Sequence, residues 1–161
     1  ESPEERVAQL LKSSKFTVGV FESLTGGLIT STITEVPGSS DYLLGGMAVY
    51  SNQSKVKAGI QYELIEKYGA VSAETASAMA ETACTYFGSD CGIGVTGVAG
   101  PAMQPGENIE PGTVFIAIAH PKGVEVKQYK FPPRRTLVRG RTVTQALLQL
   151  AQILQINQYA E

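Results

Sequence analysis

Short apolar segments that end in small-residue turns alternate along this chain with segments of helical periodicity, and this alternation is the feature that most restricts the fold. Residues 16–22, 45–51 and 91–97 form three such apolar segments, and their lengths are typical of buried strands. A chain that alternates in this way packs its strands side by side, mostly parallel, between two layers of helices. The pattern therefore predicts an α/β fold.

Capping signals and apolar stripes mark the helices between these strands. Ser2, Pro3 and Glu5 form a capping box with proline at the first helical position, and Ser72 and Gly88 bound the strongest internal pattern. The helices predicted from such signals begin near residue 3, cover 26–34, begin near 51, cover 62–68 and 72–88, and run from about 135 to the end of the chain.

A different pattern follows the third strand. Residues 98–112 are rich in proline and glycine, and loops of this length are usually functional or disordered. Residues 113–119 and 124–131 then flank the turn 120–123, which predicts an antiparallel hairpin. The whole chain is thus predicted to be one three-layer α/β/α sandwich with a mixed, mostly parallel sheet of about five strands, and the sequence leaves open whether it belongs to a longer protein.

Composition excludes several classes of protein. The 161 residues are 43% apolar and 17% charged with a net charge of −2, so the chain as a whole has no electrostatic attraction for nucleic acid or an anionic membrane. Cys84 and Cys91 form no metal-binding or disulfide pattern, and His120 is the only histidine. We expect both cysteines to be free thiols that pack in the core, as is usual in a cytoplasmic protein. We also expect the protein to use no metal or cofactor and to bind neither nucleic acid nor a membrane.

Three strands end in turns of small and hydroxyl-bearing residues, "ESLTGG" (22–27), "YSNQSK" (50–55) and "TGVAGP" (96–101). In an open α/β sheet, ligands bind in the crevice outside the carboxyl ends of the strands. We therefore expect the three turns to face one common crevice, although each turn taken alone is as well explained by a tight connection between elements.

The first turn predicts an anion site. Gly26 and Gly27 are expected to open a helix, which exposes backbone N–H groups and the positive end of its dipole beside Ser23. Such a site could also stabilise an oxyanion. The alternative is that the glycines only make the turn and that Thr25 caps the helix.

The second turn and the last helix each contain two polar residues that are four positions apart, with at least one basic side chain in each pair. Ser51 and Lys55 are four residues apart and share a face. A desolvated, neutral lysine can activate a serine hydroxyl, but Lys55 could equally be solvated with Ser51 as a cap. Arg135 and Arg139 are also four apart, which suits either a phosphate clamp or a solvated helix face. Thr96 ends the third strand.

The remaining polar residues are weaker candidates. His120 lies in the hairpin turn, so a catalytic triad would require it to reach the far end of the sheet. Glu22 and Asp41 could assist at a site, or only cap or orient a loop.

The motifs "ESLTGG", "VPGSS", "GGMAVYSNQSK", "YGAVSAETA", "GVTGVAGP" and "PGTVFIA", in this order over about residues 4–155, resemble those of the CinA C-terminal domain family, which includes nicotinamide mononucleotide deamidases. The resemblance implies metal-free hydrolysis of nicotinamide mononucleotide to nicotinate mononucleotide and ammonia. It also implies an α/β/α domain, a small-molecule nucleotide as partner, and a homodimer or larger homo-oligomer. The catalytic residues implied by matching positions are Ser23, Lys55 and Thr96.

Combined with the turn analysis, the resemblance predicts that Ser23 attacks the carboxamide and that Lys55 acts as base, because a serine from another turn can face the lysine. Ser51 remains the alternative nucleophile. The residues expected to bind substrate are Thr25, Gly26, Gly27, Tyr50, Ser51, Asn52, Gly97, Ala99, Gly100, Arg135 and Arg139.

The chain departs from the family pattern at two places. Leu24 stands where members usually have a cysteine, and Ala102 and Met103 stand where they usually have a glycine-rich run. The second change borders the expected site. It favours an alternative function, a mononucleotide-binding or interaction module without turnover, and a weaker third option is hydrolysis of another small amide.

Overall fold

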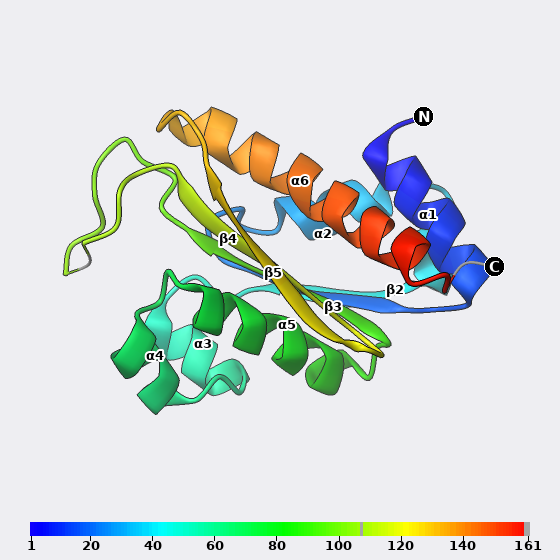
Figure 1. The fold of residues 1–161 in the computed structure, drawn as a ribbon, viewed down its shortest axis with the longest axis horizontal. Helices are drawn as coiled ribbons and strands as arrows, with labels where there is room; N and C mark the ends of the chain where they lie inside the picture. Colours follow the sequence, from blue (N-terminus) through cyan, green and yellow to red (C-terminus); the bar gives the residue numbers. More distant parts are fainter. Residues whose placement is uncertain (107, 160–161) are drawn as a thin grey trace.

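The computed structural model describes residues 1–106 and 108–159, and within them one mixed five-stranded sheet forms the centre of the molecule (Figure 1). The strand order is β2-β1-β3-β4-β5. Strand β1 is parallel to β2 and to β3, whereas β3–β4 and β4–β5 are antiparallel pairs. The strands are β1 (Val18–Glu22), β2 (Leu43–Ala48), β3 (Cys91–Gly97), β4 (Thr113–His120) and β5 (Gly123–Lys130). The predicted α/β fold is confirmed, with β4 as the strand that runs against the others.

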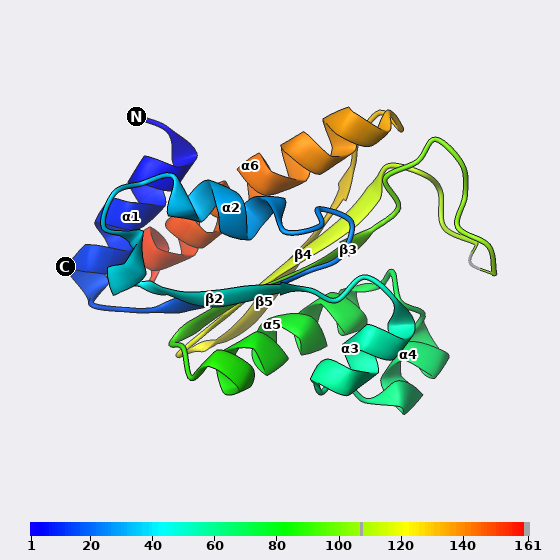
Figure 2. The ribbon, with the colours of Figure 1, turned by 180° about the vertical axis from the view of Figure 1, so that it is seen from behind.

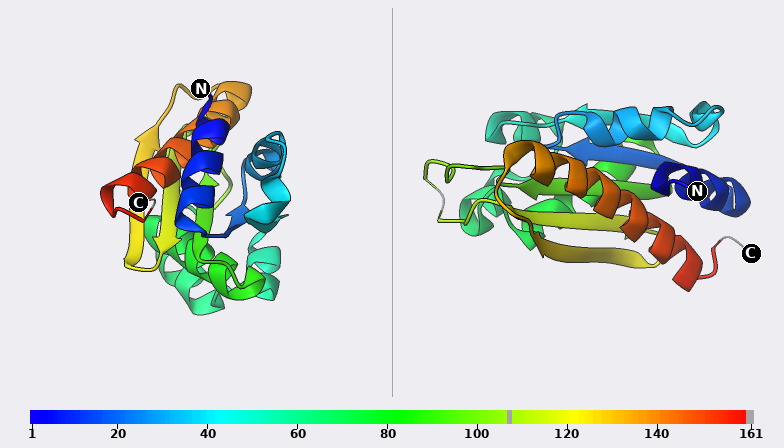
Figure 3. Two further views of the ribbon diagram at one scale, coloured as in Figure 1. Left: turned by 90° about the vertical axis from the view of Figure 1, so that its right-hand side faces the viewer. Right: turned by 90° about the horizontal axis from the view of Figure 1, so that it is seen from above.

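Helices cover both faces of this sheet (Figures 1 and 2). Helices α1, α2 and α6 lie on one face, and α3, α4 and α5 lie on the other, which the end-on view in Figure 3 shows as three layers. Their bounds are α1 (Pro3–Ser14), α2 (Leu28–Thr34), α3 (Asn52–Ala58), α4 (Tyr62–Tyr68), α5 (Ala73–Phe87) and α6 (Arg135–Ile156), with a 3-10 turn at Ser39–Asp41. In the part of the chain that the structure describes, no helix combines the length and apolar character needed to cross a membrane.

The alternating direction of the side chains along β1 explains how the core is divided between the two faces of the sheet. Val18 and Val20 pack with α1 and α6, whereas Phe21 packs with Met79 and Ala83 of α5. Successive side chains of a strand point to opposite faces. Because helices cover both faces, every residue of β1 is buried, and the strand is apolar throughout except for Glu22 at its end.

Glycines on β3 let helix α5 approach the sheet closely. A Cβ atom at Gly92 would lie 2.1 Å from the Ala80 carbonyl oxygen, and one at Gly94 would lie 2.3 Å from the Ala76 carbonyl oxygen. Only glycine fits a strand position where another backbone comes so near. The small residues of β3 therefore set the distance between the sheet and α5.

Some predicted element bounds were wrong by a few residues. Helix α2 begins at Leu28 rather than at residue 26, because Gly26 and Gly27 have φ values of +61° and +105°, which are not helical. The second strand covers 43–48 rather than 45–51, which leaves Ser51 outside the sheet as the N-cap of α3.

The cysteines are free thiols, as predicted. Cys91 is fully buried in the core, and this burial raises the pKa of its thiol to about 12. Burial also raises the pKa of the Cys84 thiol. A thiol that stays protonated is a poor nucleophile, so both residues act as packing groups.

Candidate functional site

The turns that follow β1, β2 and β3 meet at the end of the sheet where these three parallel strands have their carboxyl termini. Helix α2 connects β1 to β2 on one face, and α5 precedes β3 on the other, so the connections diverge on either side of β1 and open a crevice there. Two adjoining hollows of about 220 and 110 Å³ occupy this place. Ser23, Tyr50, Gly97 and Gln104 line both of them.

Ser23 and Lys55 are in contact inside the smaller hollow. The Lys55 Nζ atom donates to Ser23 Oγ at 3.2 Å and to the Tyr50 carbonyl oxygen at 3.1 Å. Ser23 is 7% exposed and Lys55 is 2% exposed. Two residues that are 32 positions apart in sequence thus form a buried hydroxyl–amine pair, and the alternative of a solvated Lys55 is wrong.

Local capping explains why Lys55 points at Ser23 rather than at Ser51. The Ser51 hydroxyl accepts the backbone N–H of Ser54 at 3.0 Å and so begins helix α3. One turn of helix later, the Lys55 side chain extends away from solvent into the crevice. Ser51 lines neither hollow, so its position is that of a helix cap.

Thr96 belongs to the same hollow. Its side chain is 1% exposed, and its hydroxyl donates to the Ala70 carbonyl oxygen at 2.8 Å. Thr96 therefore ties the end of β3 to the segment that precedes α5, and it adds a second hydroxyl-bearing side chain to the wall formed with Ser23 and Lys55.

Glu22 occupies the N-terminus of α2, where the sequence predicted an open anion site. Its buried carboxylate accepts the backbone N–H groups of Ile29 and Thr30 at 2.9 and 2.8 Å. It also accepts the hydroxyl groups of Thr25 and Thr30, both at 2.6 Å. These donors are already satisfied by a carboxylate of the chain itself, so the prediction of an open anion site at the start of α2 is wrong.

The Ser23 turn is also closed on itself. The Gly26 N–H donates to the Ser23 carbonyl oxygen at 3.0 Å, and the Leu28 N–H donates to the Thr25 carbonyl oxygen at 3.1 Å. Thr25 is fully buried, and its hydroxyl donates to Glu22 instead of capping α2. Thr25, Gly26 and Gly27 line neither hollow.

The two arginines of α6 take different positions. Arg135 lines the larger hollow, where its guanidinium donates to the Gly100 carbonyl oxygen and to the Tyr50 hydroxyl, both at 3.1 Å. Arg139 donates from Nε to the Leu24 carbonyl oxygen at 3.0 Å and from Nη2 to the Thr25 carbonyl oxygen at 3.2 Å. The structure therefore does not bring the two together as one clamp.

Of the other residues expected to bind substrate, Asn52 lines the smaller hollow, and Ala99 and Gly100 line the larger one. Sequence reasoning missed Gln104, which lines both hollows from the loop 98–112. Its only signal was the unusual length of that loop.

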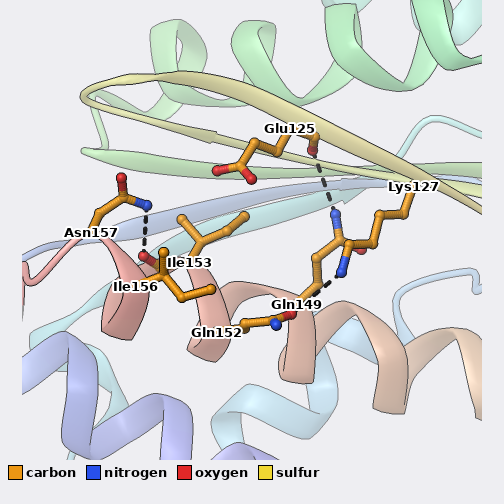
Figure 4. Close-up of a pocket in the computed structure, with 7 residues that line it drawn as sticks. All are labelled: Glu125, Lys127, Gln149, Gln152, Ile153, Ile156 and Asn157. Carbon is orange, nitrogen blue, oxygen red and sulfur yellow. Dashed lines mark hydrogen bonds between the residues drawn. The ribbon is translucent and has the colours of Figure 1, made fainter.

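Two other hollows carry no comparable chemistry. The one between β5 and α6 contains Glu125, Lys127 and Gln152 (Figure 4), and there the Lys127 ammonium donates to Gln152 at 3.3 Å. A larger hollow of about 800 Å³ lies beside α3 and α4 and is lined partly by Tyr62. Neither is lined by Ser23 or Lys55.

His120 lies at the opposite edge of the sheet, because β4 runs antiparallel to β3 and ends where β3 begins. Its Nδ1 atom lies 2.9 Å from the Tyr159 hydroxyl oxygen. The prediction that it takes no part in a triad with Ser23 agrees with this placement.

The chain as a whole is similar to known proteins. Residues 1–154 match the family model described as the CinA C-terminal domain. A CinA-like protein of Leptospira biflexa is 42% identical over 151 residues, which cover 92% of this chain and 36% of that protein. The chain spans only 34–38% of the length of the first curated relatives it matches.

Solved structures agree with the fold. The competence/damage inducible protein CihA of Agrobacterium tumefaciens matches with a TM-score of 0.84 and 32% identity, covering 95% of both chains. A CinA superfamily protein of Escherichia coli matches with a TM-score of 0.89 and 26% identity, covering 94% of this chain and 90% of that one.

Proposed function

The chain belongs to the CinA C-terminal domain family, and on this premise we propose that it hydrolyses the carboxamide of nicotinamide mononucleotide to give nicotinate mononucleotide and ammonia. The observation that carries the proposal is the 3.2 Å contact between Ser23 Oγ and Lys55 Nζ in a hollow at the switch point of the sheet. A serine paired with a buried amine is a constellation for acyl transfer.

The reaction runs in two halves. Ser23 Oγ attacks the carboxamide carbon while its proton passes to the neutral amine of Lys55, whose Nζ atom lies 3.2 Å from Ser23 Oγ. The tetrahedral intermediate collapses as the C–N bond breaks, and Lys55 returns the proton to the departing ammonia. Water then attacks the acyl ester while Lys55 takes one of its protons. Lys55 returns that proton to Ser23 Oγ as the ester bond breaks, and the released nicotinic acid group loses its own proton to solvent. Thr96 keeps this wall in place through Ala70.

Arg135 is the group that we propose to hold the 5′-phosphate. It lies at the wall of the larger hollow, which adjoins the Ser23–Lys55 pair, and a planar guanidinium binds phosphate oxygens well. Tyr50 is exposed and accepts a hydrogen bond from Arg135, so it stands between the phosphate end and the reacting end. Anchoring one end of a substrate fixes the other for attack.

The experiment that tests the proposal is incubation of the purified chain with nicotinamide mononucleotide, followed by measurement of ammonia and nicotinate mononucleotide, with calorimetry to measure binding. We expect stoichiometric release of both products. Binding of the nucleotide without release of ammonia would show that the chain is a mononucleotide-binding module without turnover. Release of ammonia from other small amides but not from this nucleotide would show that the chain hydrolyses a different amide.

The loop that departs from the family pattern yields a prediction about substrate affinity. Ala102 and Met103 line the larger hollow, and Met103 is 48% exposed there. Replacing Met103 by glycine removes a side chain from the wall that faces substrate but leaves Ser23 and Lys55 in place. We expect KM for the nucleotide to change by about three- to tenfold, equivalent to about 1 kcal/mol, with kcat within twofold. A large fall in kcat with unchanged KM would contradict this assignment of Met103 to substrate binding.

A further inference from the structure

We propose that Glu22 and Arg139 are positioning residues that hold the Ser23 turn from its two sides so that the Ser23 hydroxyl faces Lys55. The inference rests on the proposed function of Ser23 as the nucleophile. It assigns a task to two residues that line neither of the two hollows, and it gives Arg139 a role different from that of Arg135.

Glu22 fastens the turn to the elements on either side of it. It is the last residue of β1, it is fully buried, and it lies directly before Ser23. Its carboxylate accepts four hydrogen bonds, three of them from α2 at Ile29 and Thr30 and one from Thr25 within the turn. Hydrogen bonds to an ionised group are shorter and stronger than neutral ones. The side chain that precedes the nucleophile thus ties the start of α2 back to the end of β1.

Arg139 holds the other side of the turn. Its Nε and Nη2 atoms donate to two successive carbonyl oxygens, those of Leu24 and Thr25, which directly follow Ser23. A guanidinium presents its donors in a fixed planar fork, so the two bonds fix the orientation of the peptide between them. Arg139 is thereby joined to the backbone of the nucleophile turn.

The attachment of the turn by both Glu22 and Arg139 restrains a backbone segment that contains two glycines. Gly26 and Gly27 have left-handed φ angles and place few conformational limits on the backbone. A nucleophile on so permissive a segment would sample several orientations, and a displacement of about 1 Å can cost about 100-fold in rate. Glu22 and Arg139 supply the restraint that the glycines lack.

The test compares Arg139→Ala with Arg135→Ala, which lies one helical turn away on α6. For Arg139→Ala we expect kcat for nicotinamide mononucleotide to fall about 100-fold, with KM within about twofold. For Arg135→Ala we expect the main change in KM. A rise in KM with unchanged kcat for Arg139→Ala would show that Arg139 binds substrate and would overturn the proposal.

A second readout does not depend on the substrate. A fluorophosphonate phosphonylates an activated serine, with fluoride as the leaving group, and mass spectrometry locates the modified residue. We expect Ser23 of the intact protein to be labelled, and Arg139→Ala to slow labelling in parallel with kcat. Equal labelling rates, or no labelling of Ser23 in the unchanged chain, would overturn the proposal even if nicotinamide mononucleotide proved not to be the substrate.

The Glu22 half of the proposal is tested through its partner Thr25, because Glu22→Gln would place an amide N–H₂ among hydrogen-bond donors and unfold the chain. Thr25→Val removes one of the four hydrogen bonds and retains the buried shape of the side chain. We expect labelling of Ser23 to slow about tenfold in a Thr25→Val protein that retains its circular dichroism spectrum. Unchanged labelling in the folded variant would overturn the role of Glu22.

Discussion

Replacing Lys55 by methionine is expected to reduce ammonia release from nicotinamide mononucleotide by about 10⁴-fold, the upper end of what proton transfer by a positioned side chain contributes. Methionine approximates the length of the lysine stem and suits a site that is 2% exposed. It removes the only atom of this side chain that can take the Ser23 proton. The measurement is steady-state ammonia production, with circular dichroism to verify folding.

Lys57→Met is the matched control for this prediction. Lys57 lies on the same helix α3, is exposed, and lines neither of the hollows that contain Ser23. We expect the control to retain turnover within about twofold. If Lys55→Met retained more than a tenth of the activity, Lys55 would not be the base.

Ser23→Ala should match Lys55→Met in its effect, because a nucleophile and its base act as one unit. The comparison with Ser51→Ala identifies the nucleophile. Loss of turnover in Ser51→Ala together with full turnover in Ser23→Ala would transfer the assignment to Ser51, against the 3.2 Å contact that Ser23 makes with Lys55.

The second large effect concerns stability. Gly94→Ala is expected to lower the free energy of unfolding by about 3 kcal/mol, the upper end of the typical cost of about 1–3 kcal/mol for overpacking a filled core. The added Cβ atom would lie 2.3 Å from the Ala76 carbonyl oxygen and 2.4 Å from the Ala80 backbone nitrogen. Both atoms belong to the backbone of α5, so no side-chain rotation can relieve the contact. The measurement is urea denaturation followed by circular dichroism.

Gly140→Ala provides the control for substitution of a glycine. Gly140 lies in α6 and is exposed. Apart from its chain neighbours and the backbone of its own helix, no atom of the described residues lies within 4 Å of a Cβ placed there. Alanine is favoured over glycine inside a helix by about 0.5–1 kcal/mol, so we expect this variant to be more stable than the unchanged chain. A Gly94→Ala protein as stable as the unchanged chain would show that α5 can move away from β3 without cost.

The sequence was sufficient to predict the fold and the central pair of the site. Strands appeared as apolar segments and helices as capped periodic segments, and the parallel strands required their carboxyl-end turns to meet. Ser23 and Lys55 follow from that rule together with the family resemblance, although they are far apart in sequence. The structure brings them into hydrogen-bonding contact.

The functions of polar side chains behind the turn could not be predicted in this way. The contacts of Glu22 and Arg139 depend on the direction in which each side chain points in the folded domain. Helical spacing does not give this direction, and from spacing alone Arg139 was grouped with Arg135. The open anion site was a reasonable expectation from two glycines before a helix, but it overlooked that the preceding acid can bend back onto the same amides. Local spacing does not reveal which of two acceptors a donor selects.

The position of Arg139 in the last helix has a consequence for the order of events during synthesis. The turn that carries Ser23 is made of residues 22–28, but two of its carbonyl groups are bonded by a residue more than 110 positions later. A growing polypeptide on the ribosome can form β1 and α2 early, yet it cannot fasten this turn until α6 has emerged and docked. Ser23 of a nascent or prematurely ended chain therefore lacks the attachment to Arg139 that its turn has in the finished domain.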